Sequence, residues 1–418
     1  MITAIETSEG NVAAVPLRAG KGTASARFLV GLCVYAAGVT GAHASLIVAP
    51  HSAGRDGDLA GIVVAAPDDG ASASLINPAG VVSAARDQAL LALMPGTVTV
   101  SYENPVSGYR GSGSKQFLAL NLWLGLGEWH GWSFGAGAFG SMGAAFKLPA
   151  DPSIGQTSPF LGEMGMLNFG VNAGRTLAPG LRVGFQLSPS YAMQKARSPS
   201  PMGDLDFEAD GVGWSGALGL VYDASERLAL GLAYRSRGVT ELRGDARIGG
   251  MDDDVSITFV TPQSVSVGSA LRWSKRLRLL AQLRWTDYAQ FEDGDIEFKT
   301  ASMMNMPVIA DARSGVHWGI AAEYQVFPGS WLRGGFTVGK AMIEDSAVAP
   351  NMFDHDSKMA MLGYEIAYGR IMVGFTAGFV WLESRTIDPA TNPYFPGHYD
   401  TQDTIFAGGA RVTWNLRP

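Results

Sequence analysis

Apolar and polar residues alternate with a period of two along most of the chain after residue 87. In the segment 227–237, one face collects the apolar side chains Leu228, Leu230, Leu232 and Tyr234. The same alternation recurs in 264–273, 278–286, 317–326, 332–339 and 406–416. Because successive side chains of a strand point to opposite faces, this pattern predicts strands that are apolar on one face and polar on the other.

The alternating segments and the turn residues between them suggest fifteen candidate strands. They span 88–101, 115–127, 131–147, 163–176, 180–196, 207–223, 226–237, 238–249, 263–274, 277–290, 315–327, 330–343, 358–369, 370–385 and 402–416. Single-chain barrels of bacterial outer membranes use an even number of strands, so we expect one of the fifteen to be wrong and the barrel to have about 14. The segment 88–101 is the weakest, because Pro95-Gly96 interrupts it.

Two observations favour a membrane barrel over a soluble β-sandwich. Aromatic side chains fall at the ends of candidate strands, where a membrane barrel has its interfacial girdles: Tyr234, Trp273, Trp285, Trp318, Trp381 and Trp414. The polar faces carry arginines that a soluble core would bury at high cost but a polar lumen would solvate or pair: Arg284, Arg333 and Arg411. The predicted fold is therefore all-β, a transmembrane antiparallel β-barrel. Its expected extracellular loops include 198–204, 292–313 and 388–401.

The first 44 residues read as a signal peptide. The apolar run 28–39 is too short to span a bilayer as a helix. Ala42-His43-Ala44 then matches the small-x-small pattern of a cleavage site. The alternative is an N-terminal membrane anchor. Cleavage would also remove Cys33, the sole cysteine, which suits export to an oxidising compartment.

Composition and charge exclude several classes of function. The chain is 47% hydrophobic, 17% charged and has a net charge of −7. It lacks the clustered Lys and Arg of a nucleic-acid surface, so no nucleic-acid partner is predicted. The histidines are scattered without metal-ligand spacing, and we expect no metal, no cofactor and no catalytic residue. The runs Asp252-Asp253-Asp254 and Asp354-His355-Asp356 are interpreted as solvated loops.

Residues 45–86 precede the strands and are rich in small residues, yet too apolar for a disordered tail. We expect them to form a packed hatch, or plug, in the lumen of a barrel that spans 87–418. The hatch contains a tight turn at Asn77, Pro78, Ala79 and Gly80. Proline presets φ at the second turn position, the asparagine side chain can accept a hydrogen bond from the backbone two residues on, and proline favours an extended conformation of the residue before it.

With these features together, the chain resembles the outer-membrane long-chain fatty acid and aromatic hydrocarbon transporters of the OMPP1/FadL/TodX type. The resemblance covers nearly the whole chain after the leader. Four segments carry it, in the same order as in the family: the hatch ending SLINPAG, the pair of strands in LALGLAYRSRGVTELRGDARI, the hairpin PQSVSVGSALRWSKRLRLLAQLRWTDYAQF, and the strand WLRGGFTVGK. The chain departs from the family at Ile76, where an aromatic residue is usual, and in its short, Pro-rich loops.

The resemblance implies a 14-stranded barrel whose hydrophobic ligand leaves sideways through a gap made by a kink in the third strand. Residues 77–79 match the family's hatch turn, and Phe139, Gly140 and Gly143 match its kinked stretch. Glycines there weaken the strand, as a bulge or kink requires. Apolar hatch residues that a water-filled porin would not need form the predicted ligand path: Leu75, Ile76, Val81 and Val82.

The predicted function is passive uptake of hydrophobic compounds, either long-chain fatty acids or hydrocarbons, across the outer membrane of a Gram-negative bacterium. The expected partners are such small molecules, the lipid and lipopolysaccharide of the outer membrane, and the barrel assembly machinery. The alternatives are a general porin and a structural or adhesive barrel. An outer-membrane esterase is a third possibility, but no residue pattern points to it.

Overall fold

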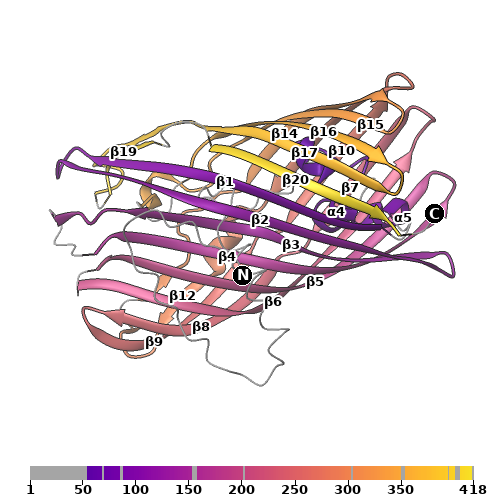
Figure 1. The fold of residues 1–418 in the computed structure, drawn as a ribbon. Helices are drawn as coiled ribbons and strands as arrows, with labels where there is room; N and C mark the ends of the chain where they lie inside the picture. The colour runs from indigo at the N-terminus through magenta and orange to yellow at the C-terminus, as the bar shows by residue number, and fades with distance from the viewer. Residues whose placement is uncertain are drawn as a thin grey trace, which may run out of the picture.

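The computed structural model describes residues 54–67, 70–84, 88–152, 158–200, 203–302, 305–349, 354–393, 395–400 and 405–416. These residues form a long antiparallel β-barrel with short helices inside it (Figure 1). The predicted signal peptide and residues 45–53 of the predicted hatch lie outside the described residues.

The first helical turns precede all strands: α3 (Arg55–Asp58), α4 (Gly70–Leu75), η1 (Pro78–Gly80) and α5 (Val81–Ala84). The strands of the first half follow as β1 (Gln88–Asn104), β2 (Tyr109–Trp129), β3 (Trp132–Leu148), β4 (Phe160–Ala178), β5 (Leu181–Ser200), β6 (Gly203–Asp223), β7 (Leu228–Arg235), β8 (Gly238–Ile248), β9 (Met251–Thr261) and β10 (Ser264–Arg272). The second half comprises β11 (Leu277–Thr286), η3 (Tyr288–Asp293), β12 (Asp295–Phe298), β13 (Met306–Pro307), β14 (Gly315–Phe327), β15 (Ser330–Gly339), η5 (Asp345–Ala347), β16 (Ser357–Tyr368), β17 (Ile371–Leu382), β18 (Arg385–Ile387), β19 (Gly397–Asp400) and β20 (Ile405–Asn415).

Pairing closes these segments into a ring of 14 strands. β7 and β8 both pair with β6, so together they make one wall strand. β10 and β9 pair with the two halves of that strand, and β11 and β12 pair in turn with β10 and β9. The segments β9 and β10 therefore also make one wall strand, as do β11 and β12. The ring closes where β1 pairs with β20 along residues 88–97. The predicted all-β membrane barrel is therefore confirmed, and so is its expected strand number.

The segment 88–101 is a true strand, and the error among the fifteen candidate strands lies at 226–249. Segments 226–237 and 238–249 are the two halves of one wall strand, since β6 pairs with both. β1 runs unbroken through Pro95, and its ladder to β20 skips that position, so the missing N–H is not needed. Residues 198–204, predicted to be a loop, belong largely to β5 and β6, whose ladder runs from Leu181 to Ser200.

The acidic run 252–254 is also not a loop. It lies in β9, where it pairs with residues 245–247 of β8. Asp253 accepts hydrogen bonds from the backbone of Thr300 and Ala301, so it orders the following outer loop. Strand residues at this end of the barrel are exposed to water, so charged side chains are tolerated there. An acidic run can therefore belong to a strand, which is why the loop prediction for 252–254 was wrong.

The outward face of β6 changes from acidic to apolar at one point along the strand. Its outward residues are Asp204, Asp206, Glu208 and Asp210, followed by the exposed Val212, Trp214, Leu218 and Tyr222. Residues 212–222 match the roughly 9–11 residues with which a tilted strand crosses a bilayer. The membrane therefore surrounds only this part, and the acidic part extends beyond it.

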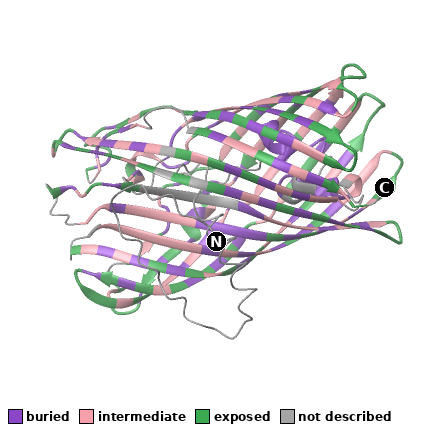
Figure 2. Cartoon of the chain, viewed as in Figure 1, coloured by how far each residue is buried: buried purple, intermediate pink, exposed green. Residues whose placement is uncertain are grey.

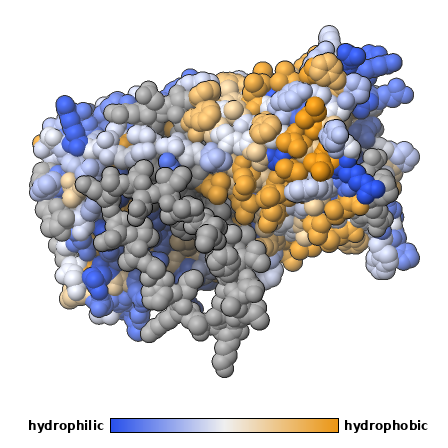
Figure 3. Space-filling view, viewed as in Figure 1, coloured by the Kyte–Doolittle hydropathy of each residue, from blue (hydrophilic) through white to orange (hydrophobic). Residues whose placement is uncertain are grey.

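Inward-facing residues of the acidic half are apolar. In the acidic half of β6, the inward Leu205, Phe207 and Ala209 are at most 4% exposed and belong to a continuous apolar core. Burial alternates along the strands in Figure 2, and apolar side chains gather over the half of the barrel nearest the C-terminus in Figure 3. Short turns join the strands at that end, which is the periplasmic end of an outer-membrane barrel.

The predicted girdle aromatics all face outward. Each of them is at least 37% exposed, namely Tyr234, Trp273, Trp285, Trp318, Trp381 and Trp414. Tyr234 and Trp285 are not at the ends of their wall strands, which continue into β8 and β12, and both residues lie at the level of Val265 of β10. Among the described residues, no helix is both long and apolar enough to cross a membrane.

Residues 54–67 and 70–84, called here the inner segment, contact the wall at glycines. A Cβ on any of these glycines would overlap the inner segment: Gly174, Gly184, Gly219, Gly231, Gly268, Gly319, Gly335 and Gly363. At Gly184, for example, it would lie 2.3 Å from the carbonyl carbon of Pro78. The glycines belong to eight different wall strands, so the inner segment follows the inside of the barrel around most of its circumference.

Candidate functional site

The predicted turn at 77–80 is present and deeply buried. Asn77 is extended, with φ −143° and ψ 108°, and its Oδ1 accepts a hydrogen bond of 3.0 Å from the N–H of Ala79. Pro78–Gly80 form one 3₁₀ turn. The isolated motif is typical of a surface turn, but here its side chains are inside the barrel, with Asn77 fully buried.

Asn77 also connects the inner segment to the wall. Its Nδ2 donates to the carbonyl oxygen of Val64 at 2.7 Å, and makes longer contacts with the carbonyl oxygens of Leu220 and Leu232, at 3.2 and 3.4 Å. The last two residues belong to β6 and β7. One side chain thus holds two parts of the inner segment together and faces two wall strands.

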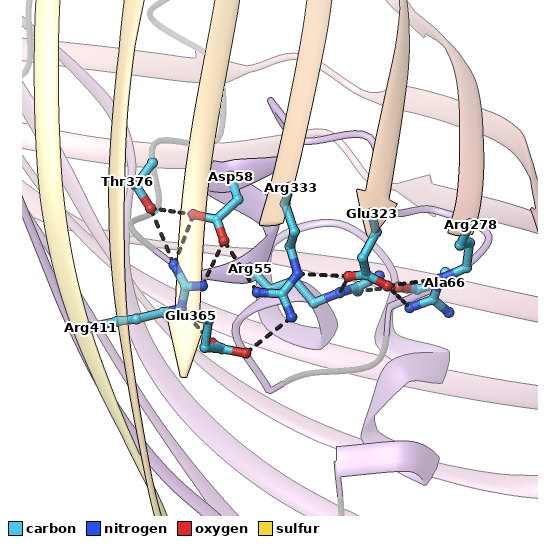
Figure 4. Close-up of polar contacts among 9 residues, drawn as sticks. All are labelled: Arg55, Asp58, Ala66, Arg278, Glu323, Arg333, Glu365, Thr376 and Arg411. Atoms are coloured by element: carbon cyan, nitrogen blue, oxygen red, sulfur yellow. Dashed lines mark hydrogen bonds and ion pairs between the residues drawn. The ribbon is translucent and has the colours of Figure 1, made fainter. Parts of the chain in front are cut away.

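A second connection is the buried network of ion pairs in Figure 4, which we call the charge cluster. It consists of Arg55 and Asp58 from α3 and, from the wall, Arg278, Glu323, Arg333, Glu365, Thr376 and Arg411. Three carboxylates meet four guanidinium groups, and all of these charged side chains except Arg278 are at most 9% exposed. Buried charges need such mutual pairing, since an isolated one would be far too costly.

Asp58 lies at one end of the charge cluster. Arg411 donates to both of its oxygens, at 2.8 and 2.6 Å, Arg333 approaches to 3.3 Å, and Thr376 donates to Oδ1. At the other end, Glu323 accepts from Arg55 at 2.6 Å. The sequence predicted that Arg333 and Arg411 face a polar lumen. Their shared carboxylate partner in α3, Asp58, was missed, because the four residues of this helical turn carry no periodic signal.

A small cavity lies between the inner segment and the wall. Its volume is about 70 Å³, and its apolar lining includes Leu75, Ile76, Phe139 and Met166. An apolar cavity of roughly 150 Å³ holds one benzene molecule, so this cavity is closed to such a ligand unless a lining group moves. The cavity brings together two of the four predicted path residues and the predicted gate residue Phe139.

The other two predicted path residues lie elsewhere. Val81 and Val82 are packed against the wall at Gly174, where an added Cβ would lie 2.7 and 3.1 Å from their methyl groups. Neither contributes to the cavity lining. The polar lining includes Arg235 and Arg284 but, among the described residues, no aspartate or glutamate. Arg235 donates to the carbonyl oxygen of Leu75 at 2.9 Å, and Arg284 to Ser266 Oγ at 3.3 Å.

The third wall strand is irregular at the predicted kink. The ladder between β3 and β4 shifts register between Gly140 and Met142, which is a β-bulge. Within the described strands, the ladder between β2 and β3 ends at the pair Asn121–Phe139. β2 remains paired with β1, and β3 with β4, far beyond this point.

The two strands approach each other again near their outer ends. A Cβ on Gly113 of β2 would lie 1.7 Å from the carbonyl oxygen of Lys147 of β3. Residues 114–120 of β2 therefore face residues 140–146 of β3 without a ladder between them. This stretch is bounded by the pair Asn121–Phe139 at its inner end and by the contact of Gly113 with Lys147 at its outer end. Phe139 lies both at its inner limit and in the cavity lining, while Gly140 and Gly143 are part of its edge.

The run 354–356 differs from its predicted role as a solvated loop. Asp354 and His355 are at most 1% exposed. Asp354 Oδ2 accepts from the N–H groups of Met342 and Ile343, and His355 Nδ1 contacts the carbonyl oxygen of Glu383 at 2.7 Å. These contacts hold the outer loops together. In the described ranges, no group of three or more His, Cys, Asp or Glu side chains is arranged to hold a metal ion.

Residues 141–370 match the family described as outer membrane protein transport protein (OMPP1/FadL/TodX). A FadL homologue of Pseudomonas aeruginosa has the same fold, with a TM-score of 0.76, 13% identity, and coverage of 91% of this chain and 100% of that chain. A search of curated proteins finds no match.

Two toluene transporters are also similar in structure. TodX of Pseudomonas putida has a TM-score of 0.66 and 16% identity, with coverage of 82% of this chain and 93% of its own. TbuX of Ralstonia pickettii has a TM-score of 0.65 and 16% identity, with coverage of 86% and 97%. At these identities the structural likeness establishes the fold.

Proposed function

Because the chain belongs to the outer membrane protein transport protein family (OMPP1/FadL/TodX), we propose that it is a passive channel that releases its hydrophobic ligand sideways into the membrane. The family comprises outer-membrane transporters of hydrophobic compounds. The observation that carries the proposed route is the position of Phe139, which lines the cavity and also ends the ladder between β2 and β3. A ligand leaving the cavity past this ring reaches the unpaired stretch directly.

The inner segment acts as the hatch in this proposal. Its ion pairs, the Asn77 hydrogen bonds and its contact with wall glycines support a segment that blocks the lumen until it moves. The cavity of about 70 Å³ is too small for the ligand, so transport requires Leu75 and Ile76 to shift. We assign the whole of residues 45–86 to this hatch.

The cavity chemistry favours an amphipathic ligand with a carboxylate. Arg235 and Arg284 supply two cations beside an apolar surface, and no acidic side chain is among the described lining residues. Guanidinium groups bind carboxylates through strong charge-assisted hydrogen bonds. A fatty acid therefore fits better than a neutral hydrocarbon. Toluene transport by similar proteins keeps hydrocarbons as the second candidate.

Gly140→Val tests the lateral route. In cells that lack their own transporter, uptake of labelled oleate through this variant should fall to background, because a β-branched side chain at the bulge narrows the unpaired stretch. Gly408→Val is the matched control, since Gly408 lies on the lipid-facing side of β20 with at least 3.6 Å of space around its Cβ position. Normal uptake by folded Gly140→Val would refute the gate assignment.

Conductance in planar bilayers separates this function from a general porin. A hydrophobic-ligand channel with a seated hatch should pass few ions, and deletion of residues 45–73 should raise its conductance. A high conductance of the intact protein would favour the porin. We further propose that the protein has no enzymatic activity. Hydrolysis of a chromogenic ester by the pure protein would contradict this part of the proposal. The proposed partners, besides the ligand, are lipopolysaccharide and the barrel assembly machinery.

A further inference from the structure

A groove of about 670 Å³ lies on the lipid-facing side of the wall, on the opposite face from the cavity and the charge cluster. It spans β10, β11, β14 and β15. One row of its lining is Leu271, Leu279, Ala322 and Gly334, which are successive partners across the four strands. The side chains of Leu271 and Leu279 project beside the small Ala322 and Gly334, so the groove is deepest over these two small residues.

The groove lies next to the periplasmic edge of the membrane. The adjoining outward row, one step nearer the short turn between β10 and β11, contains Trp273, Tyr324 and Leu332, each at least 41% exposed. Trp and Tyr side chains at a strand end mark the level of the lipid headgroups. The groove therefore opens into the hydrocarbon region of the periplasmic leaflet.

Cations lie at the headgroup end of the groove. The turn after Trp273 contains the exposed Lys275 and Arg276. Because β7 pairs with β10, the neighbouring turn brings Arg227 close, and its carbonyl oxygen accepts from the N–H of Arg272 at 2.7 Å. The two turns, 224–227 and 273–276, contain one acidic residue, Glu226, against three basic ones, so their net charge is positive. Asp223, the last residue of β6, adjoins the first turn.

We propose that the groove and these cations bind one anionic phospholipid of the periplasmic leaflet. The phosphate lies at Lys275 and Arg276, the glycerol region lies at Trp273, and one acyl chain fills the groove. An unfilled groove would lose dispersion contacts along its lining, which an acyl chain restores. The basic residues select an anionic headgroup over a zwitterionic one, because each cation near an anionic headgroup attracts it.

The test is native mass spectrometry of the full-length protein in mild detergent, titrated with phosphatidylglycerol or phosphatidylcholine. The wild type should retain one phosphatidylglycerol and bind phosphatidylcholine more weakly. The double variant Lys275→Glu/Arg276→Glu should bind phosphatidylglycerol about 30-fold more weakly or worse, from about 1 kcal/mol for each cation removed. Arg370→Glu is the matched control, since Arg370 lies in the turn between β16 and β17.

Gly334→Ile tests the acyl half of the site. Its Cβ would meet only ordinary contacts, at 3.5 Å or more, so the barrel tolerates the change while the groove is filled. The retained lipid should be lost here but kept in Gly408→Ile. Equal phosphatidylglycerol binding by all four variants would overturn the proposal, and so would equal binding of the two lipids by the wild type. A wild-type protein that is a dimer without bound lipid, and that becomes monomeric in Gly334→Ile, would also overturn the proposal. In that case a second copy of the chain would occupy the groove.

Discussion

Asp58→Asn should release the inner segment from the wall while leaving the barrel intact. The substitution keeps the shape of the side chain and removes its charge. Asp58 is fully buried and accepts hydrogen bonds from Arg411, Arg333 and Thr376. Without it, the charge cluster changes from three carboxylates against four guanidinium groups to two against four.

The magnitude follows from what remains. Removing one partner of a buried ion pair costs about 3–5 kcal/mol, because the other charge stays buried without compensation. Arg411 and Arg333 both keep Glu365, at 2.8 and 3.0 Å, so we expect the lower end, about 3 kcal/mol. At about 1.4 kcal/mol for each factor of ten, the detached population should rise roughly 100-fold.

Hydrogen exchange of the backbone amides of residues 59–66, followed by mass spectrometry, measures this population. Exchange in this segment should become about 100-fold faster in Asp58→Asn, with the wall strands unchanged, and single-channel openings should become more frequent. Glu103→Gln is the control, because the pair Glu103–Arg110 is exposed, at 42% and 78%, and worth little. Unchanged exchange at 59–66 would refute the anchoring role of the charge cluster, whereas faster exchange throughout the barrel would show that Asp58 stabilises the wall instead.

Three further substitutions address the turn, the cavity and the outer loops. Asn77→Ala leaves the Val64 carbonyl and the Ala79 N–H without this buried partner, so protease cleavage of the inner segment should increase in line with a loss of about 2–4 kcal/mol; unchanged cleavage would contradict this. Arg284→Gln should lower uptake of oleate at least tenfold but leave toluene uptake within about twofold, and an equal loss of both would remove the carboxylate from the proposal. Burial lowers the pKa of His355 from 6.5 to about 4, so the unfolded loops take up a proton that the folded loops exclude between these pH values. The outer loops should lose up to about 3 kcal/mol as the pH falls from 6.5 to 4, measured by hydrogen exchange corrected for intrinsic rates, and His355→Gln should remove this dependence.

Only part of the cavity lining follows from the sequence. Leu75 and Ile76 of the predicted ligand path and Phe139 of the predicted gate line one cavity, while their roles in transport stay predictions. Val81 and Val82 share the apolar character of Leu75, but α5 directs them to Gly174. Composition distinguishes an apolar side chain from a polar one, and it does not say which wall strand that side chain will meet.

The strand count shows a related limit. Gly238 follows a plausible strand end at Arg235, so two segments counted as neighbours when they are two halves of one strand. The outer parts of the strands carry charges on their outward faces and apolar residues inside. A pattern of period two reports that one face differs from the other, but not which face meets lipid, water or the interior.

The sequence by itself determined the fold class, the outward aromatic residues, the turn geometry at 77–80 and the weakness of β3 at Gly140. These depend on period, on backbone restrictions of proline and glycine, and on the cost of burying unpaired arginine, all of which act locally. Only the tertiary structure decided that Asp58 meets Arg411, 353 positions away, and that the ladder from β2 to β3 stops at Phe139. Closing the ring brings such residues together, and the contacts between them depend on the register of all the strands between, which no short stretch of sequence contains.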